Sequence, residues 1–226
     1  MRNFAVIPAA GTGMRMNSKV PKQYLTISNM PILAITLDKI AQINNLQEIV
    51  VAINPKDNYF GNLPKPKNVK ITTVEGGANR ADSVENCLNY LKNIAHADDW
   101  IIVHDAARPL VKINCIHKLL DSIKDSETGG ILVAKVNDTI KQQTDNAPKT
   151  IDRSMIFRAL TPQIFRFSLL CRALKSAKNH QVTDEAQAIE LLNLDYKLLV
   201  GDSSNIKITT KEDLKYAQFL LQEDVI

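Results

Sequence analysis

The N-terminal stretch is the most informative part of the sequence, because the apolar run Phe4-Ala5-Val6-Ile7 leads straight into the loop Pro8-Ala9-Ala10-Gly11-Thr12-Gly13-Met14-Arg15-Met16. A short continuous apolar run is typical of a strand that is buried on both faces of a sheet. Glycines and other small residues directly after such a strand let backbone N–H groups approach a phosphate. The stretch therefore predicts an α/β sheet with an anion-binding loop after its first strand.

The rest of the chain alternates short apolar runs with longer segments of helical periodicity. The predicted strands are Phe4–Pro8, Glu48–Ile53, Val69–Val74, Trp100–His104, Gly130–Val136 and Tyr196–Val200. The predicted helices are Pro31–Ile43, Asn79–Ile94, Lys112–Lys124, Ser168–Lys178, Asp184–Leu194 and Lys211–Gln222. Alternation of strand and helix favours a doubly wound, mostly parallel sheet.

Length and composition limit the class of protein. The chain has 226 residues, 45% of them hydrophobic, with 28 Lys and Arg against 24 Asp and Glu. We expect residues 1–226 to form a single domain that needs neither disulfides nor a structural metal to stay folded. Disordered, collagen-like and disulfide-scaffold proteins are excluded. A formal charge of +4 is too small to indicate a nucleic-acid partner.

Location follows from the cysteines and the apolar runs. Cys87, Cys115 and Cys171 are odd in number and far apart, as expected of thiols in a reducing compartment. No stretch reaches the roughly 20 apolar residues that a membrane span needs, and the first apolar run is too short for a signal peptide. We expect a soluble, cytoplasmic protein.

One segment, residues 137–153, breaks the alternation. It is polar, with Lys141-Gln142-Gln143-Thr144-Asp145-Asn146 at its centre, and Val136 and Ile151 flank it. Long connections inside a compact domain are usually functional or disordered. A hairpin that buries no face is marginally stable alone, so an ordered arm here needs a partner subunit.

Two cations follow the first strand. Arg15 lies in the loop, and Lys22 lies in Pro21-Lys22-Gln23-Tyr24. A dinucleotide-binding loop would have a third glycine where Met16 stands, and a Walker loop would have Gly-Lys-Ser/Thr, which the chain lacks. The pattern favours a nucleoside triphosphate that releases pyrophosphate, since that chemistry needs positioning and charge neutralisation. The alternative is a tight turn with two solvated cations.

Two more loops follow later strands. A helix is predicted to begin within Gly76-Gly77-Ala78-Asn79-Arg80-Ala81-Asp82-Ser83. The positive N-terminal end of its dipole, together with Arg80 and Ser83, favours an anion. The alternative is that Gly-Gly forms a plain turn. His104-Asp105-Ala106-Ala107-Arg108-Pro109 follows an apolar strand. Asp105 is a candidate Mg²⁺ ligand and Arg108 a candidate phosphate ligand, with a structural Asp–Arg pair as the alternative. His104 is read as a packed residue rather than a general base.

Polar residues at the ends of other elements complete the candidate site. Thr183 precedes Asp184-Glu185 and predicts a helix cap. Lys207 lies between Ile206 and Ile208, so alternation turns it away from both apolar neighbours. The remaining candidates are Thr139, Arg153 and Thr161.

Taken together, these motifs with Asp152-Arg153, Leu160-Thr161-Pro162-Gln163, Thr183-Asp184-Glu185 and Asn205-Ile206-Lys207-Ile208-Thr209 resemble the family of 2-C-methyl-D-erythritol 4-phosphate cytidylyltransferases of the non-mevalonate isoprenoid pathway. The resemblance runs collinearly from Phe4 to about Leu221. It implies a homodimer of Rossmann-like subunits with the arm used in dimerisation. It also implies that the enzyme joins CTP to methylerythritol phosphate with Mg²⁺ and releases pyrophosphate.

The resemblance also implies roles for particular residues. Arg15 and Lys22 stabilise the transition state, and Arg153 and Lys207 position the substrate phosphate. We expect the nucleotide to contact Ala9, Ala10, Gly11, Thr12, Gly13, Gly76, Gly77, Arg80, Ser83, Asp105 and Ala106. We expect methylerythritol phosphate to contact Asp105, Arg108, Thr139, Arg153, Thr161 and Thr183, part of this pocket coming from the partner's arm.

Three other functions remain open at this point. A cytidylyltransferase for ribitol 5-phosphate or another polyol phosphate would share the nucleotide half of the site. A non-catalytic nucleotide sensor would have no need of cations at the leaving group, and a sugar-nucleotide glycosyltransferase would need a second acid beside Asp105.

Overall fold

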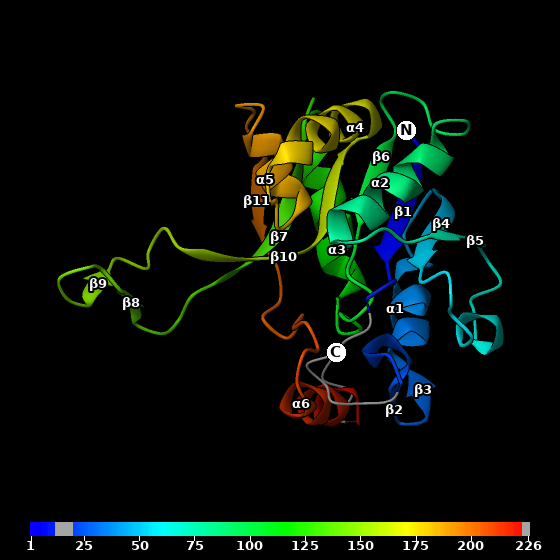
Figure 1. Ribbon diagram of the computed structural model, residues 1–226, viewed down its shortest axis with the longest axis horizontal. Coiled ribbons are helices and arrows are strands. Elements are labelled where there is room, and N and C mark those ends of the chain that lie inside the picture. The colour runs from blue at the N-terminus through cyan, green and yellow to red at the C-terminus, as the bar shows by residue number, and fades with distance from the viewer. Residues whose placement is uncertain (12–19, 223–226) are drawn as a thin grey trace.

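Seven strands form the central sheet of the computed structural model, which describes residues 1–11 and 20–222 (Figure 1). In spatial order they are β11 (Lys197–Val200), β7 (Gly129–Lys135), β10 (Phe157–Arg166), β6 (Trp100–Val103), β1 (Asn3–Pro8), β4 (Leu46–Ile53) and β5 (Lys70–Glu75). β10 runs antiparallel to both of its neighbours, and the other pairings in this sheet are parallel. The predicted α/β class with a mostly parallel sheet is confirmed.

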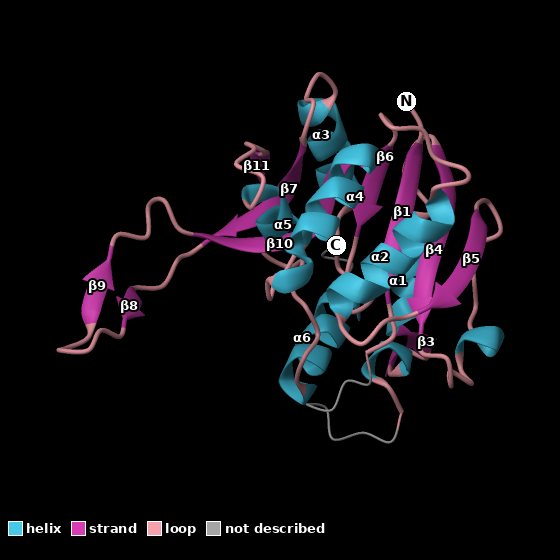
Figure 2. Ribbon diagram, turned by 45° about the horizontal axis from the view of Figure 1, so that its top comes forward, coloured by secondary structure: helices cyan, strands magenta, loops and turns pink. Residues whose placement is uncertain are grey.

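Helices cover both faces of this sheet (Figure 2). They are α1 (Ile32–Ile40) and α3 (Ile113–Ile123) on one face, and α2 (Arg80–Leu91), α4 (Phe167–Ser176) and α5 (Glu185–Glu190) on the other. The strands alternate accordingly: Ala5 and Ile7 of β1 pack with α1, whereas Phe4 and Val6 pack with α2. Within the described part of the chain, no helix combines the length and apolar character needed to cross a membrane.

A third apolar cluster holds the C-terminal segment beside the sheet. Helix α6 (Lys211–Gln222) contributes Ala217 and Leu220, which cluster with Ile27 and Ile208. The Ile208 N–H also donates to the Ala107 carbonyl at 2.9 Å. Residues more than 90 positions apart in the chain are thereby fixed next to the end of β6. The smaller elements are η2 (Lys22–Tyr24), β2 (Thr26–Ile27), β3 (Met30–Pro31), η3 (Phe60–Asn62) and η4 (Ala177–Asn179).

Of the seven strands of the central sheet, the sequence analysis missed one, β10. All six predicted strands and all six predicted helices are present, with ends that differ by a few residues. β10 contains Pro162 and several polar residues, which argue against a central strand. The register of its pairing with β7 shifts between Ala159 and Gln163, and this irregular stretch contains Thr161 and the proline.

Residues 137–153, the predicted arm, project from the body of the protein (Figure 1). Two short strands, β8 (Ile140–Gln142) and β9 (Lys149–Ile151), pair antiparallel near the tip. Ile140 and Ile151 lie opposite each other in this pair and are only partly buried. Such a hairpin buries too little apolar surface to be stable alone.

The strand order creates a switch point next to β1. The chain passes from β1 to β4 and then β5, and returns to the other side of β1 to form β6. Loops that leave neighbouring strands in opposite directions open a crevice at the carboxyl ends of those strands. This topology places a crevice beside the loops after β1, β4, β5 and β6.

Gly129 offers a test of the sheet. Its φ is +142°, and an added Cβ would collide with the carbonyl oxygen of Ile164 on β10. We therefore expect Gly129→Ala to lower the free energy of unfolding by about 2–3 kcal/mol. Gly61→Ala is the matched control, because an added Cβ there meets nothing within 4 Å. Urea denaturation of both variants measures the difference, and equal midpoints would contradict the prediction.

Candidate active site

A cleft of about 520 Å³ lies at the predicted crevice. It is lined by residues that follow β1, β4, β5 and β6, together with η2 and the segment before α6. The predicted site residues that line it are Ala9, Ala10, Gly11, Lys22, Gly77, Arg80, Ser83, Asp105, Ala106 and Lys207. Residues from the two ends of the chain therefore meet in one cleft. Thr12, Gly13 and Arg15 lie outside the described residues.

The loops after β1 and β5 pack tightly against each other in the wall of this cleft. A Cβ added to Gly76 would overlap the Cβ of Ala10, so a side chain there would push the two loops apart. The Ser83 hydroxyl accepts a hydrogen bond from the Gly77 N–H at 3.1 Å and donates to the Asn79 carbonyl at 2.9 Å. The glycines thus serve close packing, and Ser83 holds the loop on the first turn of α2.

Asp105 is the centre of a charged cluster in the cleft. Its side chain is 8% exposed. Its Oδ1 accepts from Arg80 Nε at 3.0 Å, and its Oδ2 lies 3.1 Å from Arg108 Nε and 3.0 Å from Lys207 Nζ. Burial alone would raise the pKa of Asp105, but the charges of Arg80, Lys207 and Arg108 outweigh it and hold this pKa well below its usual range. Asp105 is therefore ionised.

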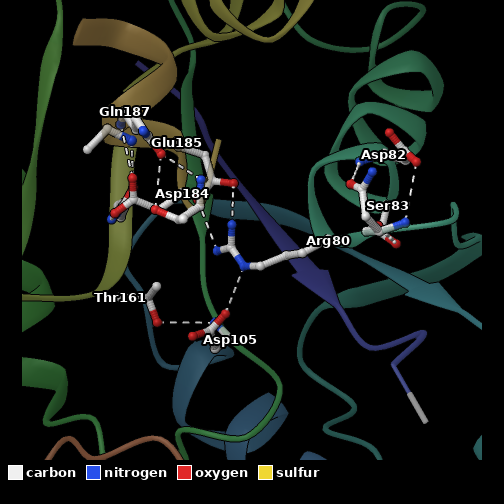
Figure 3. Close-up of polar contacts among 12 residues, drawn as sticks. Arg80, Asp82, Ser83, Asp105, Thr161, Asp184, Glu185 and Gln187 are labelled. Atoms are coloured by element: carbon white, nitrogen blue, oxygen red, sulfur yellow. Dashed lines mark hydrogen bonds and ion pairs between the residues drawn. The ribbon is translucent and has the colours of Figure 1, made fainter. Parts of the chain in front are cut away.

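Arg80 continues the cluster to helix α5, as Figure 3 shows. Its Nη1 and Nη2 donate to the two carboxylate oxygens of Glu185 at 2.7 and 3.0 Å. Glu185 is fully buried, with a side chain only 1% exposed. Arg80 thus lies between two carboxylates and binds both.

The backbone below Asp105 is held by β10. The Asp105 N–H donates to the Thr161 hydroxyl at 3.1 Å, and this hydroxyl also lies 3.0 Å from His104 Nδ1. His104 is completely buried, and burial lowers the pKa of its ring to about 4. A neutral, buried imidazole that is engaged on both nitrogens, the second by the Arg108 carbonyl, is a packed residue rather than a general base.

The two predicted reaction lysines both line the cleft. Lys22 Nζ donates to the carbonyl of Ile208 at 3.0 Å, and Ile208 is the residue that follows Lys207. Ile206 and Ile208 pack into the third apolar cluster, and Lys207 turns to Asp105. The alternation read from the sequence gives the right orientation for Lys207, although residues 205–209 form no regular strand.

The remaining predicted site residues lie in different places. Arg108 Nη1 donates to the Asn205 carbonyl at 2.7 Å, and Thr161 is buried beneath the cleft. Thr183 lies on a neighbouring cavity of about 630 Å³ that shares Arg80 with the cleft. Its predicted capping role is wrong, because the N-cap of α5 is Asp184, whose carboxylate accepts from the Gln187 N–H.

Thr139 and Arg153 are exposed residues of the arm, and neither lines the cleft of its own chain. The Arg153 guanidinium donates to the carbonyl of Asn137, across the base of the arm. The structure therefore brings Lys22, Arg80, Asp105, Arg108 and Lys207 together and leaves the two arm residues apart from them.

The contacts of Asp105 do not favour a protein-held metal. Both of its oxygens already accept from cationic side chains. In the part of the chain that the structure describes, no group of three or more His, Cys, Asp or Glu side chains is placed to hold a metal ion. Such a donor set does not fit Mg²⁺ bound by the protein alone.

Three supporting residues escaped the sequence analysis. Glu185 was read only as part of a helix start. Gln23 is buried and donates to the carbonyls of Ala9 and Gly11 at 2.7 and 3.1 Å, which fixes the first loop. Asn205 is buried and donates to the Thr161 carbonyl at 2.7 Å. The sign of these residues in the sequence was that each is a polar residue within a motif already noted, next to apolar residues.

Comparisons with known proteins point to one family. The family model described as IspD, 2-C-methyl-D-erythritol 4-phosphate cytidylyltransferase, matches residues 3–223. A protein of that name from Pseudoalteromonas translucida is 47% identical over 221 residues, which cover 97% of this chain and 90% of that protein. One from Aliivibrio fischeri is 42% identical over 97% of this chain and 93% of that protein.

Solved structures give the same result. The 2-C-methyl-D-erythritol 4-phosphate cytidylyltransferase of Francisella tularensis superposes with a TM-score of 0.80 at 36% identity, covering 97% of this chain and 99% of that one. The 4-diphosphocytidyl-2C-methyl-D-erythritol synthase of Anaerococcus prevotii superposes with a TM-score of 0.84 at 27% identity, covering 98% of each chain. Because the family model matches nearly the whole of this chain, the chain belongs to the 2-C-methyl-D-erythritol 4-phosphate cytidylyltransferase family.

Proposed function

We propose that this enzyme transfers the cytidylyl group of CTP to 2-C-methyl-D-erythritol 4-phosphate, giving 4-diphosphocytidyl-2-C-methyl-D-erythritol and pyrophosphate. The observation that carries the proposal is the convergence of Lys22 and Lys207, 185 positions apart in the chain, on one cleft at the switch point of the sheet. The family named above supports the choice of substrates.

The charge of the cleft suits two phosphate-bearing substrates. Arg80, Arg108 and Lys207 carry three positive charges, whereas Asp105 and Glu185 carry two negative ones, so this network has a net positive charge before Lys22 is added. Side chains fixed in an ion network need little reorganisation when charge develops in the transition state. We propose that Asp105 keeps the cations oriented.

The reaction needs no general base. A phosphate monoester is anionic at neutral pH, so an oxygen of the methylerythritol phosphate attacks the α-phosphorus of CTP in line. A new P–O bond forms, and the bond from the α-phosphorus to the bridging oxygen breaks. Pyrophosphate leaves with the electron pair, and we propose that Lys22 and Arg15 neutralise the charge that builds on it.

Three further features belong to the proposal. Mg²⁺ prefers phosphate oxygens and keeps few protein ligands, so we propose that the triphosphate would hold it rather than Asp105, both of whose oxygens contact cationic side chains. We propose a homodimer in which Thr139 and Arg153 of each arm reach the partner's cleft.

A cytoplasmic location is supported by three free cysteines. The names of the relatives do not favour the ribitol 5-phosphate alternative.

Substrate choice tests the function directly. We expect pure protein with Mg²⁺ to release pyrophosphate from CTP and methylerythritol phosphate, and much less with ATP, GTP or UTP, or with ribitol 5-phosphate. A coupled pyrophosphate assay over these pairs gives the preference. Comparable rates with ribitol 5-phosphate would overturn the assignment of the second substrate.

Lys22 is the cation to remove first. We expect Lys22→Ala to lower kcat by about 10²–10³-fold, because a preorganised positive charge at the leaving group is lost. Thermal unfolding should change little, since Lys22 is only partly buried. Lys118→Ala, an exposed lysine on α3, is the control and should behave as wild type. Near-normal turnover of Lys22→Ala would remove it from the mechanism.

Mixed dimers test whether the arm acts across subunits. Lys22→Ala and Arg153→Gln homodimers should each be nearly inactive. If Arg153 serves the partner's cleft, a heterodimer of the two variants has one intact site, so it should regain about half of the wild-type activity. Co-expression with two affinity tags isolates this heterodimer. No recovery in a stable heterodimer would place Arg153 in the cleft of its own subunit, and an active Arg153→Gln homodimer would place it outside the reaction.

A further inference from the structure

The buried carboxylate of Glu185 has no part in the mechanism above, yet it contacts the charged cluster directly. Its two oxygens accept from the two terminal nitrogens of the Arg80 guanidinium at 2.7 and 3.0 Å. A forked pair of this kind fixes the plane of the guanidinium as well as its distance. Glu185 itself does not line the cleft.

Because Glu185 fixes the plane of the Arg80 guanidinium, it also fixes the direction in which Arg80 Nε donates. Arg80 Nε donates to Asp105 Oδ1 at 3.0 Å, and Oδ2 is shared by Arg108 and Lys207. The orientation of the Asp105 carboxylate therefore depends on Arg80 at one oxygen and sets the position of the Lys207 ammonium at the other. Figure 3 shows the line of contacts from Glu185 through Arg80 to Asp105.

Helix α5 does not need Glu185 in order to dock. Gln163 on β10 donates to Asp184 Oδ2 at 2.8 Å and accepts from the Ala186 N–H at 2.8 Å. Ala186, Ala188 and Ile189 are buried in the core. The residues on both sides of Glu185 are thus anchored by contacts that do not involve its carboxylate. The role of the carboxylate is therefore its contact with Arg80.

We propose that Glu185 is a positioning residue for the transfer reaction: through Arg80 it orients Asp105 and so places Lys207 at the reacting phosphates. This inference rests on the proposed function. Removing the Glu185 carboxylate leaves the charge of Arg80 in the cleft and disturbs the placement of Asp105 and Lys207, so it acts on the rate of the chemical step more than on substrate binding. A buried carboxylate is tolerated at this position because its charge is matched by the Arg80 guanidinium that it orients.

The test compares Glu185→Gln, Arg80→Gln and the double variant by steady-state kinetics. Glu185→Gln should lower kcat by roughly 10- to 100-fold, as a small misplacement of reacting groups does, while the KM for CTP changes by less than about threefold. If Glu185 acts through Arg80, adding Glu185→Gln to Arg80→Gln should change kcat by less than about twofold. Glu190→Gln, an exposed carboxylate of the same helix, should match wild type.

The double variant also guards against misfolding, because it removes both partners and leaves no unpaired buried charge. Circular dichroism and thermal unfolding confirm that each variant is folded. Wild-type kcat in folded Glu185→Gln, or multiplicative losses in the double variant, would overturn the inference alone. A wild-type enzyme that releases no pyrophosphate from CTP and methylerythritol phosphate would overturn the proposed function, and the inference with it.

Discussion

The carboxylate of Asp105 is the point on which the cleft depends. Its three cationic partners come from the start of α2, from the loop after β6 and from the segment before α6. The three cations repel one another at these distances, and the anion between them offsets that repulsion. Conversely, an ionised carboxylate this deeply buried is tolerable only because it is paired. The cluster therefore joins three segments of the chain, and the same contacts give the cleft its positive charge.

The antiparallel strand β10 supports that arrangement from below. Its irregular stretch places the Thr161 hydroxyl under the Asp105 N–H and its carbonyl against Asn205, so two strands and the C-terminal segment share one hydrogen-bonded layer. Gln163, two residues further, anchors the start of α5. One strand thus carries the supports for both the anion of the cleft and the helix that provides Glu185.

Much of this could be predicted from the sequence, and what could not has identifiable physical causes. The apolar runs of β1, β4 and β6 predict buried parallel strands, and a ligand site at their carboxyl ends follows from topology. β10 was missed because Pro162 and its polar neighbours obscure the strand pattern. Glu185 was missed because pairing across 105 positions leaves no trace in local spacing, and a buried glutamate at a helix start looks like one that stabilises the helix dipole. Thr139 and Arg153 were placed in the site by the resemblance alone, and the structure leaves both on the arm, away from the cleft of their own chain.

The contact between Gly76 and Ala10 has a consequence for how this enzyme would change over evolution. Where two loops approach so closely, a longer side chain at position 76 would displace the loop after β1 together with its own. A single replacement there is therefore closed to the protein unless the facing loop changes as well. Evolutionary drift of these two loops would have to be concerted.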